Sequence, residues 1–186
     1  MLPVESYKPL ILLSFAILAT GLSFILIKWP AGVDHTLSQH IAKRKISIIF
    51  YIVLFVIVLV PLTLFFTKWF IPNFNMSFWF SLFVWIAVIS QFLCALIPEV
   101  PGWTENTHRL LAFTSATAIM PITLLIALDS TVATLPRLFA AIGLVIMIYS
   151  VVIMGKYNAR HPKVLSIQAS YFAIFFAVLI AATYIN

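Results

Sequence analysis

Charged residues are scarce in this chain. Only 9% of its 186 residues are charged, whereas 63% are hydrophobic, and the mean hydropathy is +1.14. A water-soluble domain of this length has too little interior to bury so much apolar surface. The composition therefore excludes a soluble protein and predicts an integral membrane protein in contact with the lipid bilayer. The net charge of +6 does not indicate a nucleic-acid partner, because the basic residues flank apolar runs and so set the topology.

Cysteine and glycine are also rare. The single cysteine, Cys94, excludes an intramolecular disulfide framework and any multi-cysteine metal cluster. Its neighbours Leu93 and Ala95 predict a packed thiol rather than a reactive one. The five glycines include no Gly-x-x-x-Gly pair, so nothing indicates a close two-helix dimer seam, and the oligomeric state stays open.

Several kinds of chemistry lack the residues that they require. None of the four histidines lies inside an apolar run, which argues against a haem-linked electron carrier. No serine has a glycine-rich nucleophile setting, and no phosphate-binding signature occurs, so hydrolysis is unsupported. No charged residue lies at mid-membrane depth, which argues against proton-coupled transport. We therefore expect no catalytic residue and no cofactor.

The long apolar runs predict an all-α fold, a polytopic bundle of six transmembrane helices formed by residues 1–186 as one domain. A spanning helix needs about 20 mostly apolar residues, and the short links leave no room for a separate soluble domain. Pro61 and Pro121 predict kinks, and Trp69, Trp79 and Tyr184 are expected in an interfacial aromatic belt. The predicted spans are 10–27, 46–66, 77–97, 110–128, 138–154 and 164–185.

Local signals predict two helix starts. Residues 36–45 contain no helix breaker, so the second helix is predicted to begin before the membrane, which sets His40 and Arg44 on one face. Thr104 or Asn106 is predicted to cap the fourth helix.

The distribution of lysine and arginine predicts the orientation. One side of a six-span bundle holds three of these residues, Lys8, Lys68 and Arg137. The other side holds eight: Lys28, Lys43, Arg44, Lys45, Arg109, Lys156, Arg160 and Lys163. By the positive-inside rule the basic side faces the cytoplasm, so both termini are predicted on the non-cytoplasmic side.

A polar hinge, residues 98–109, separates the third and fourth apolar runs and holds two of the five acidic residues, Glu99 and Glu105. The predicted topology brings it to the same side as six other polar residues: Asp34, His35, His40, Arg44, Arg160 and His161. These groups either pair as opposite charges at helix ends or form the polar mouth of an interhelical cavity.

The cavity interpretation gives a set of candidate ligand-binding residues. Gln91 and Ser115 belong to this set because a polar side chain that faces lipid is energetically unfavourable, so both are expected to face the interior of the bundle. The full set is Glu99, Trp103, Glu105, His108, Arg109, His40, Arg44, Gln91 and Ser115. No metal is expected, because a di-metal bundle site needs two Glu-x-x-His pairs and only Glu105 and His108 form one. A mononuclear site from Glu99, Glu105, His108 and His35 or His40 is the alternative.

Two resemblances bear on function. Arg160-His161-Pro162 resembles the Arg-His-Pro element of integral-membrane methyltransferases that use S-adenosylmethionine, but no glycine or acidic residue follows here to match the family's cofactor segment. The six-span layout, the Ile97-Pro98-Glu99 end of the third run and His108 before Leu110 resemble the uncharacterised membrane family known as domain of unknown function 998, related to Frag, DRAM and Sfk proteins. That resemblance implies a six-helix fold with a polar mouth at Pro98 and His108, and no reaction.

Together these observations predict a multi-pass membrane protein that binds a lipid or other amphipathic small molecule in an interhelical cavity near the hinge. The alternative is a small-solute transporter or channel. A membrane methyltransferase-like enzyme or a structural subunit of a membrane complex is also open.

Overall fold

The computed structural model describes residues 3–42, 44–157 and 161–186, and this part of the chain is helical with no strand. It contains six helices that are long and apolar enough to cross a membrane. These are α1 (Leu10–Lys28), α3 (Lys45–Phe65), α5 (Phe78–Leu96), α6 (Trp103–Leu128), α7 (Thr134–Lys156) and α8 (Val164–Tyr184). The predicted all-α fold with six spans is confirmed.

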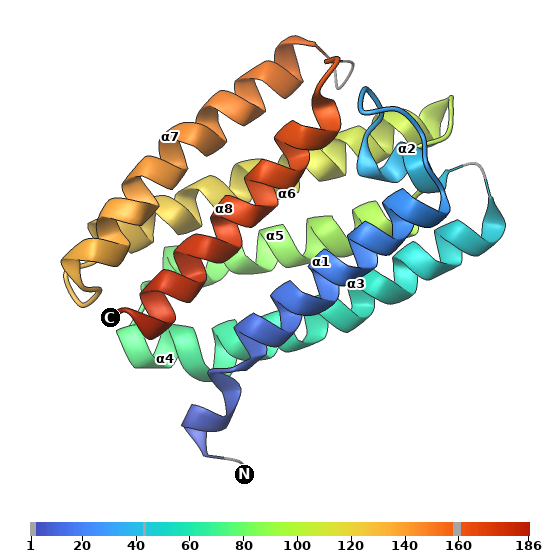
Figure 1. The fold of residues 1–186 in the computed structure, drawn as a ribbon. Coiled ribbons are helices and arrows are strands. Elements are labelled where there is room, and N and C mark those ends of the chain that lie inside the picture. The colour runs from blue at the N-terminus through green and yellow to red at the C-terminus, as the bar shows by residue number, and fades with distance from the viewer. Residues whose placement is uncertain (1–2, 43, 158–160) are drawn as a thin grey trace.

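The six helices run roughly along one direction and form a closed bundle (Figure 1). Around the bundle α1 packs against α3, α3 against α5, α5 against α6, α6 against α7, α7 against α8, and α8 against α1. Both termini lie at one end, where Figure 1 also shows the link between α6 and α7. The hinge and the short helix α2 (Leu37–Ile41) lie at the opposite end. The side on which the cytoplasm lies stays a prediction from the charge count.

The second helix is longer than predicted. α3 continues through a π-helical turn, η2 (Phe66–Phe70), into α4 (Ile71–Phe74), where a link at 67–76 was expected. Aromatic packing sustains the extension: Trp69 is buried and stacks on Phe65, so it is part of the core and not of an exposed belt. Asn75 then ends the helix with φ +47°, a left-handed conformation that asparagine tolerates better than most residues.

The fourth helix begins earlier than predicted, at Trp103 instead of Leu110. Gly102 precedes the helix and has φ +121°, a conformation that only glycine adopts readily. This glycine therefore permits the sharp turn from the hinge into the helix. Neither Thr104 nor Asn106 caps the helix, because both lie inside it, and the Thr104 hydroxyl donates to the Val100 carbonyl.

The predicted early start of the second helix is wrong. α2 ends at Ile41 and α3 starts separately at Lys45, with Arg44 in an extended conformation between them. His40 is buried and Arg44 is exposed, so they do not share one helix face. α2 instead folds back against the bundle.

The contact between α7 and α8 depends on Gly143. A Cβ atom there would lie 2.9 Å from Cγ2 of Ile174 and 3.2 Å from Cγ2 of Val178, both on stiff β-branched side chains.

We expect Gly143→Val to lower the free energy of unfolding by about 1–3 kcal/mol, because it overpacks this contact. Titration of the purified protein in mixed micelles with a denaturing detergent measures the loss. Gly155→Val is the matched control, since it adds the same side chain to the same helix at a position where a Cβ meets no atom within 4 Å. Equal stabilities of the two variants would contradict this packing.

Candidate functional site

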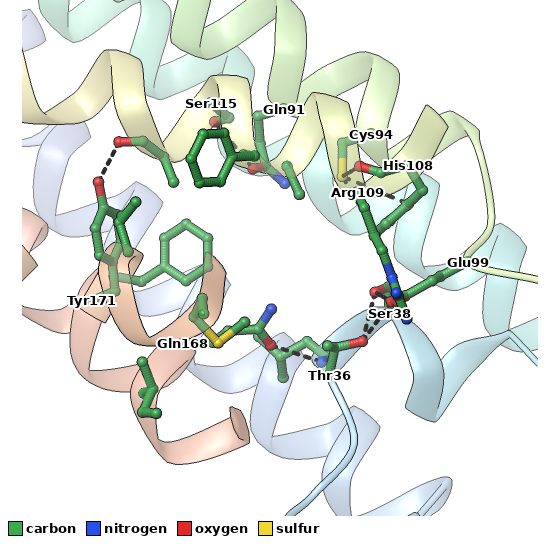
Figure 2. Close-up of a pocket in the computed structure, with 18 of the residues that line it drawn as sticks. Thr36, Ser38, Gln91, Cys94, Glu99, His108, Arg109, Ser115, Gln168 and Tyr171 are labelled. Atoms are coloured by element: carbon green, nitrogen blue, oxygen red, sulfur yellow. Dashed lines mark hydrogen bonds and ion pairs between the residues drawn. The ribbon is translucent and has the colours of Figure 1, made fainter. Parts of the chain in front are cut away.

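A partly open cavity of about 410 Å³ lies near the hinge, bordered by residues of α2, α3, α5, α6, α7 and α8. Its volume is within the range of about 300–1,000 Å³ that is usual for small-molecule sites. Figure 2 shows Gln91 and Ser115 on one side, Gln168 on the opposite side, and Glu99 with Arg109 at one end. Apolar side chains form much of the remaining wall: Phe113, Ile119, Val151, Met154, Ile167 and Phe172. The cavity is therefore an apolar chamber with one polar end.

Glu99 organises that polar end. One carboxylate oxygen, Oε2, accepts hydrogen bonds from Thr36 Oγ1 at 2.6 Å and Ser38 Oγ at 2.5 Å. The other, Oε1, accepts from Gln39 Nε2 and Arg109 Nε, both at 3.0 Å. The side chain is only 2% exposed. A carboxylate has about four acceptor positions, and protein donors fill them all, so this Glu99 network fastens α2 to the hinge.

The local sequence around α2 explains why its hydroxyls reach Glu99. Thr36 is the N-cap of α2: its hydroxyl accepts from the Gln39 backbone N–H at 3.2 Å, and Gln39 Oε1 accepts from the Thr36 N–H at 2.9 Å. This capping box fixes the first turn of α2. On its other side α2 is fastened to α8, because the Leu37 N–H donates to Gln168 Oε1 at 3.0 Å.

Arg109 also forms an ion pair with Glu105, one helical turn earlier, with 2.7 Å between Nη2 and Oε1. Glu99, Glu105 and Arg109 together carry a formal charge of −1, since two carboxylates face one guanidinium.

The pKa of Glu99 reflects opposing effects. Burial by itself raises it, but the hydrogen bonds from Ser38, Thr36 and Arg109 lower it, and His108 acts in the same direction. The net pKa lies below the ordinary value of 4.5. Because the folded pKa is the lower one, the network stabilises the protein fully above pH 4.5, and this contribution falls as the pH drops through the folded pKa.

We expect the melting temperature of the wild type to fall more steeply below pH 4.5 than that of Glu99→Gln, which has no carboxylate to protonate there. Thermal unfolding in detergent from pH 7 to pH 3 measures both slopes. Glu5→Gln, at an exposed position, should keep the wild-type slope. Parallel acid slopes for the wild type and Glu99→Gln would contradict the assignment.

Cys94 and His108 meet in the cavity wall but are not aligned for proton transfer. The His108 Nδ1–H donates to the Ile97 carbonyl at 2.6 Å. The Cys94 sulfur lies 3.6 Å from Nδ1 and 3.5 Å from Nε2. A sulfur equally far from both nitrogens lies over the ring face and not along the Nε2 lone pair. The buried thiol thus packs on the imidazole, as expected for a packed cysteine.

The nine predicted site residues divide into two groups. Five line the cavity: Gln91, Glu99, His108, Arg109 and Ser115. The other four do not line it: Trp103, Glu105, His40 and Arg44. Of these, Trp103 is 74% exposed, and His40 is a buried residue of α2 whose Nδ1 accepts from the Ala31 N–H at 2.9 Å.

The described polar residues that were expected on the same side as the hinge form separate local contacts and do not bind Glu99. Asp34 and His35 pair with each other at the surface, and His161 contacts Tyr157. Arg160 and Lys43 lie outside the described residues. Within the described ranges no three His, Cys, Asp or Glu side chains form a group that could hold a metal.

The residues that sequence reasoning missed are small and uncharged. The hydroxyls of Thr36 and Ser38 bind Glu99, and the Tyr171 hydroxyl closes the far side of the cavity by donating to the Ala116 carbonyl at 2.5 Å. The Thr36-x-x-Gln39 spacing is a capping-box signature, and this signal could have revealed a separate α2.

Comparisons of the chain with known protein families, curated proteins and solved structures found no match to any of them, so the function is argued from the site alone.

Proposed function

We propose that this multi-pass membrane protein binds a lipid or other amphipathic small molecule in the cavity. The observation that carries the proposal is a chamber of about 410 Å³ whose wall is apolar over most of its surface and polar at one end. An amphipathic molecule has the same division, an apolar chain and a polar head.

The size of the cavity argues for an occupant. Protein interiors leave few voids larger than a water molecule. Water is a poor occupant of an apolar chamber, because a buried water needs about three hydrogen-bonding partners. An acyl chain packs against apolar side chains by van der Waals contact and needs no hydrogen-bonding partner.

The wall also provides a route from the bilayer. Leu110 and Phe113 of α6 line the cavity and are 65% and 48% exposed, so the same side chains face both the chamber and the outer surface of the bundle. Gly155 on α7 lines the cavity and is exposed as well. An amphipathic molecule can therefore enter between α6 and α7 from the surrounding lipid.

The test is to purify the protein in a defined synthetic detergent, denature it and identify retained small molecules by mass spectrometry. We expect a retained amphipathic molecule at a molar ratio near one to one. Loss of retention in Ala116→Phe, which narrows the chamber, would place it in the cavity. No retained molecule, combined with solute flux in proteoliposomes, would favour the transporter or channel instead.

A further inference from the structure

The amide nitrogen of Gln168 faces the cavity without a protein acceptor. Gln168 Oε1 accepts from the Leu37 N–H at 3.0 Å, and because a backbone N–H must meet an oxygen, this bond fixes the amide orientation. Nε2 therefore points the other way, toward the open chamber in Figure 2, and it has no hydrogen bond within the described part of the chain.

Gln91 presents a second amide from the opposite wall. Its Oε1 accepts from the Ser115 hydroxyl at 3.3 Å, which leaves its Nε2 free to donate. Gln91 is on α5 and Gln168 is on α8, so two amides from helices distant in sequence border the same chamber (Figure 2).

The hydroxyl groups of the wall offer no further free hydrogen. The Tyr171 hydroxyl donates to the Ala116 carbonyl, and the Ser150 hydroxyl donates to the Ile146 carbonyl at 2.8 Å. Thr36 and Ser38 donate to Glu99. At the polar end Arg109 keeps further N–H donors. Away from that end, the donors that remain for a ligand in the described part of the wall are the two amide nitrogens.

The charges at the polar end select against an ionised head group. Among the described residues that line the chamber, Glu99 and Arg109 carry opposite charges and pair with each other. An anionic head would lie between two neutral amides without a counter-charge of its own, and burying an unpaired charge is costly. A cationic head would find no acceptor on Glu99, whose positions are filled, and would face amide donors.

On the basis of the proposed function, we propose that the ligand is an uncharged lipid whose head carries carbonyl or ester oxygens that accept hydrogen bonds from Gln168 and Gln91. The ester or carbonyl lies between the two amides, and the hydrocarbon chain lies along the apolar wall of α6 and α8.

The test compares three probes with the same hydrocarbon chain: methyl oleate, oleate and oleylamine. Each is titrated into the purified protein to displace a fluorescent amphiphile. We expect methyl oleate to bind about tenfold more tightly than oleylamine, whose ammonium leaves the buried amide donors without an acceptor. We also expect it to bind more tightly than oleate, whose carboxylate accepts hydrogen bonds but must be buried without a counter-charge.

Two variants separate ligand recognition from fold. Gln168→Glu keeps an acceptor for the Leu37 N–H but removes the amide donors, and it should weaken methyl oleate about tenfold and favour oleylamine. Gln168→Met removes the donors without adding charge and should lower the preference for the ester; it also removes the acceptor of the Leu37 N–H, so a thermal melt of the same sample reports any loss of stability. Ser166→Glu adds the same charge at an exposed position on α8 outside the cavity. It should change neither the affinity for methyl oleate nor the preference for methyl oleate over the charged probes.

The results discriminate between the two proposals. Oleate binding as tightly as methyl oleate to the wild type, or an unchanged ester preference in both Gln168 variants, would overturn the inference while leaving the binding function intact. Failure of all three probes to displace the fluorescent amphiphile would contradict the proposed function itself.

Discussion

Glu99→Ala is expected to lower the free energy of unfolding by about 3–5 kcal/mol, the usual loss when one partner of a buried ion pair is removed. The substitution removes the acceptor of four hydrogen bonds and leaves Arg109, 17% exposed, with Glu105 as its remaining partner. It also frees α2 from the hinge, because Thr36 and Ser38 lose their common partner.

Cys94 offers a direct readout of this loss. It is the single cysteine of the chain and is 3% exposed, and it lines the apolar chamber. A charged, water-soluble thiol reagent, which does not partition into that chamber, therefore labels it only when the bundle opens. Glu105→Ala is the matched control: Glu105 forms one ion pair near the surface, and exposed pairs of this spacing contribute about 0.3–0.5 kcal/mol. Similar melting temperatures for Glu99→Ala and Glu105→Ala would show that Glu99 does not organise this end of the bundle.

Ala116→Phe is expected to weaken amphiphile binding by tenfold or more, since the bulkier ring projects into a chamber that Ala116 lines. Forcing extra methylenes into an occupied site costs about 1–3 kcal/mol, which corresponds to roughly 5- to 100-fold in affinity. The folded protein should be at least as stable as the wild type, because the new side chain fills empty volume.

Displacement of a fluorescent amphiphile measures the affinity, and a thermal melt of the same sample measures the stability. Ala141→Phe is the control: Ala141 is exposed on α7 and does not line the cavity, so the same added ring should leave affinity unchanged. Equal affinities of Ala116→Phe and the wild type would mean that the amphiphile binds elsewhere.

Hydropathy predicted that six spans exist, but it did not predict where each helix begins and ends. Helix ends depend on packing contacts and backbone conformations that the hydropathy of a segment does not report. The second helix runs past its predicted end because Trp69 and Phe74 join an aromatic cluster in the core. The fourth begins at Trp103 because Gly102 adopts a positive φ. The length and hydropathy of an apolar run predict neither the aromatic cluster nor the backbone conformation of Gly102.

The candidate site was foreseen in part. Gln91 and Ser115 were expected to face inward because lipid penalises outward polar groups, and both line the cavity. Charged residues and histidines were expected near Glu99, but its carboxylate accepts hydrogen bonds from hydroxyl and amide groups as well as from Arg109. The folding back of α2 is a tertiary event, so no local pattern could place its hydroxyls there.

The orientation in the membrane, the ligand-binding role of the site residues and the resemblance to domain of unknown function 998 stay predictions. An experimental density map of the protein in lipid nanodiscs tests the central claim most directly. The account predicts elongated density, unexplained by the polypeptide, along Phe113 and Phe172 with its polar end between Gln91 and Gln168. A chamber closed by direct packing of α6, α7 and α8, with no such density, would contradict it.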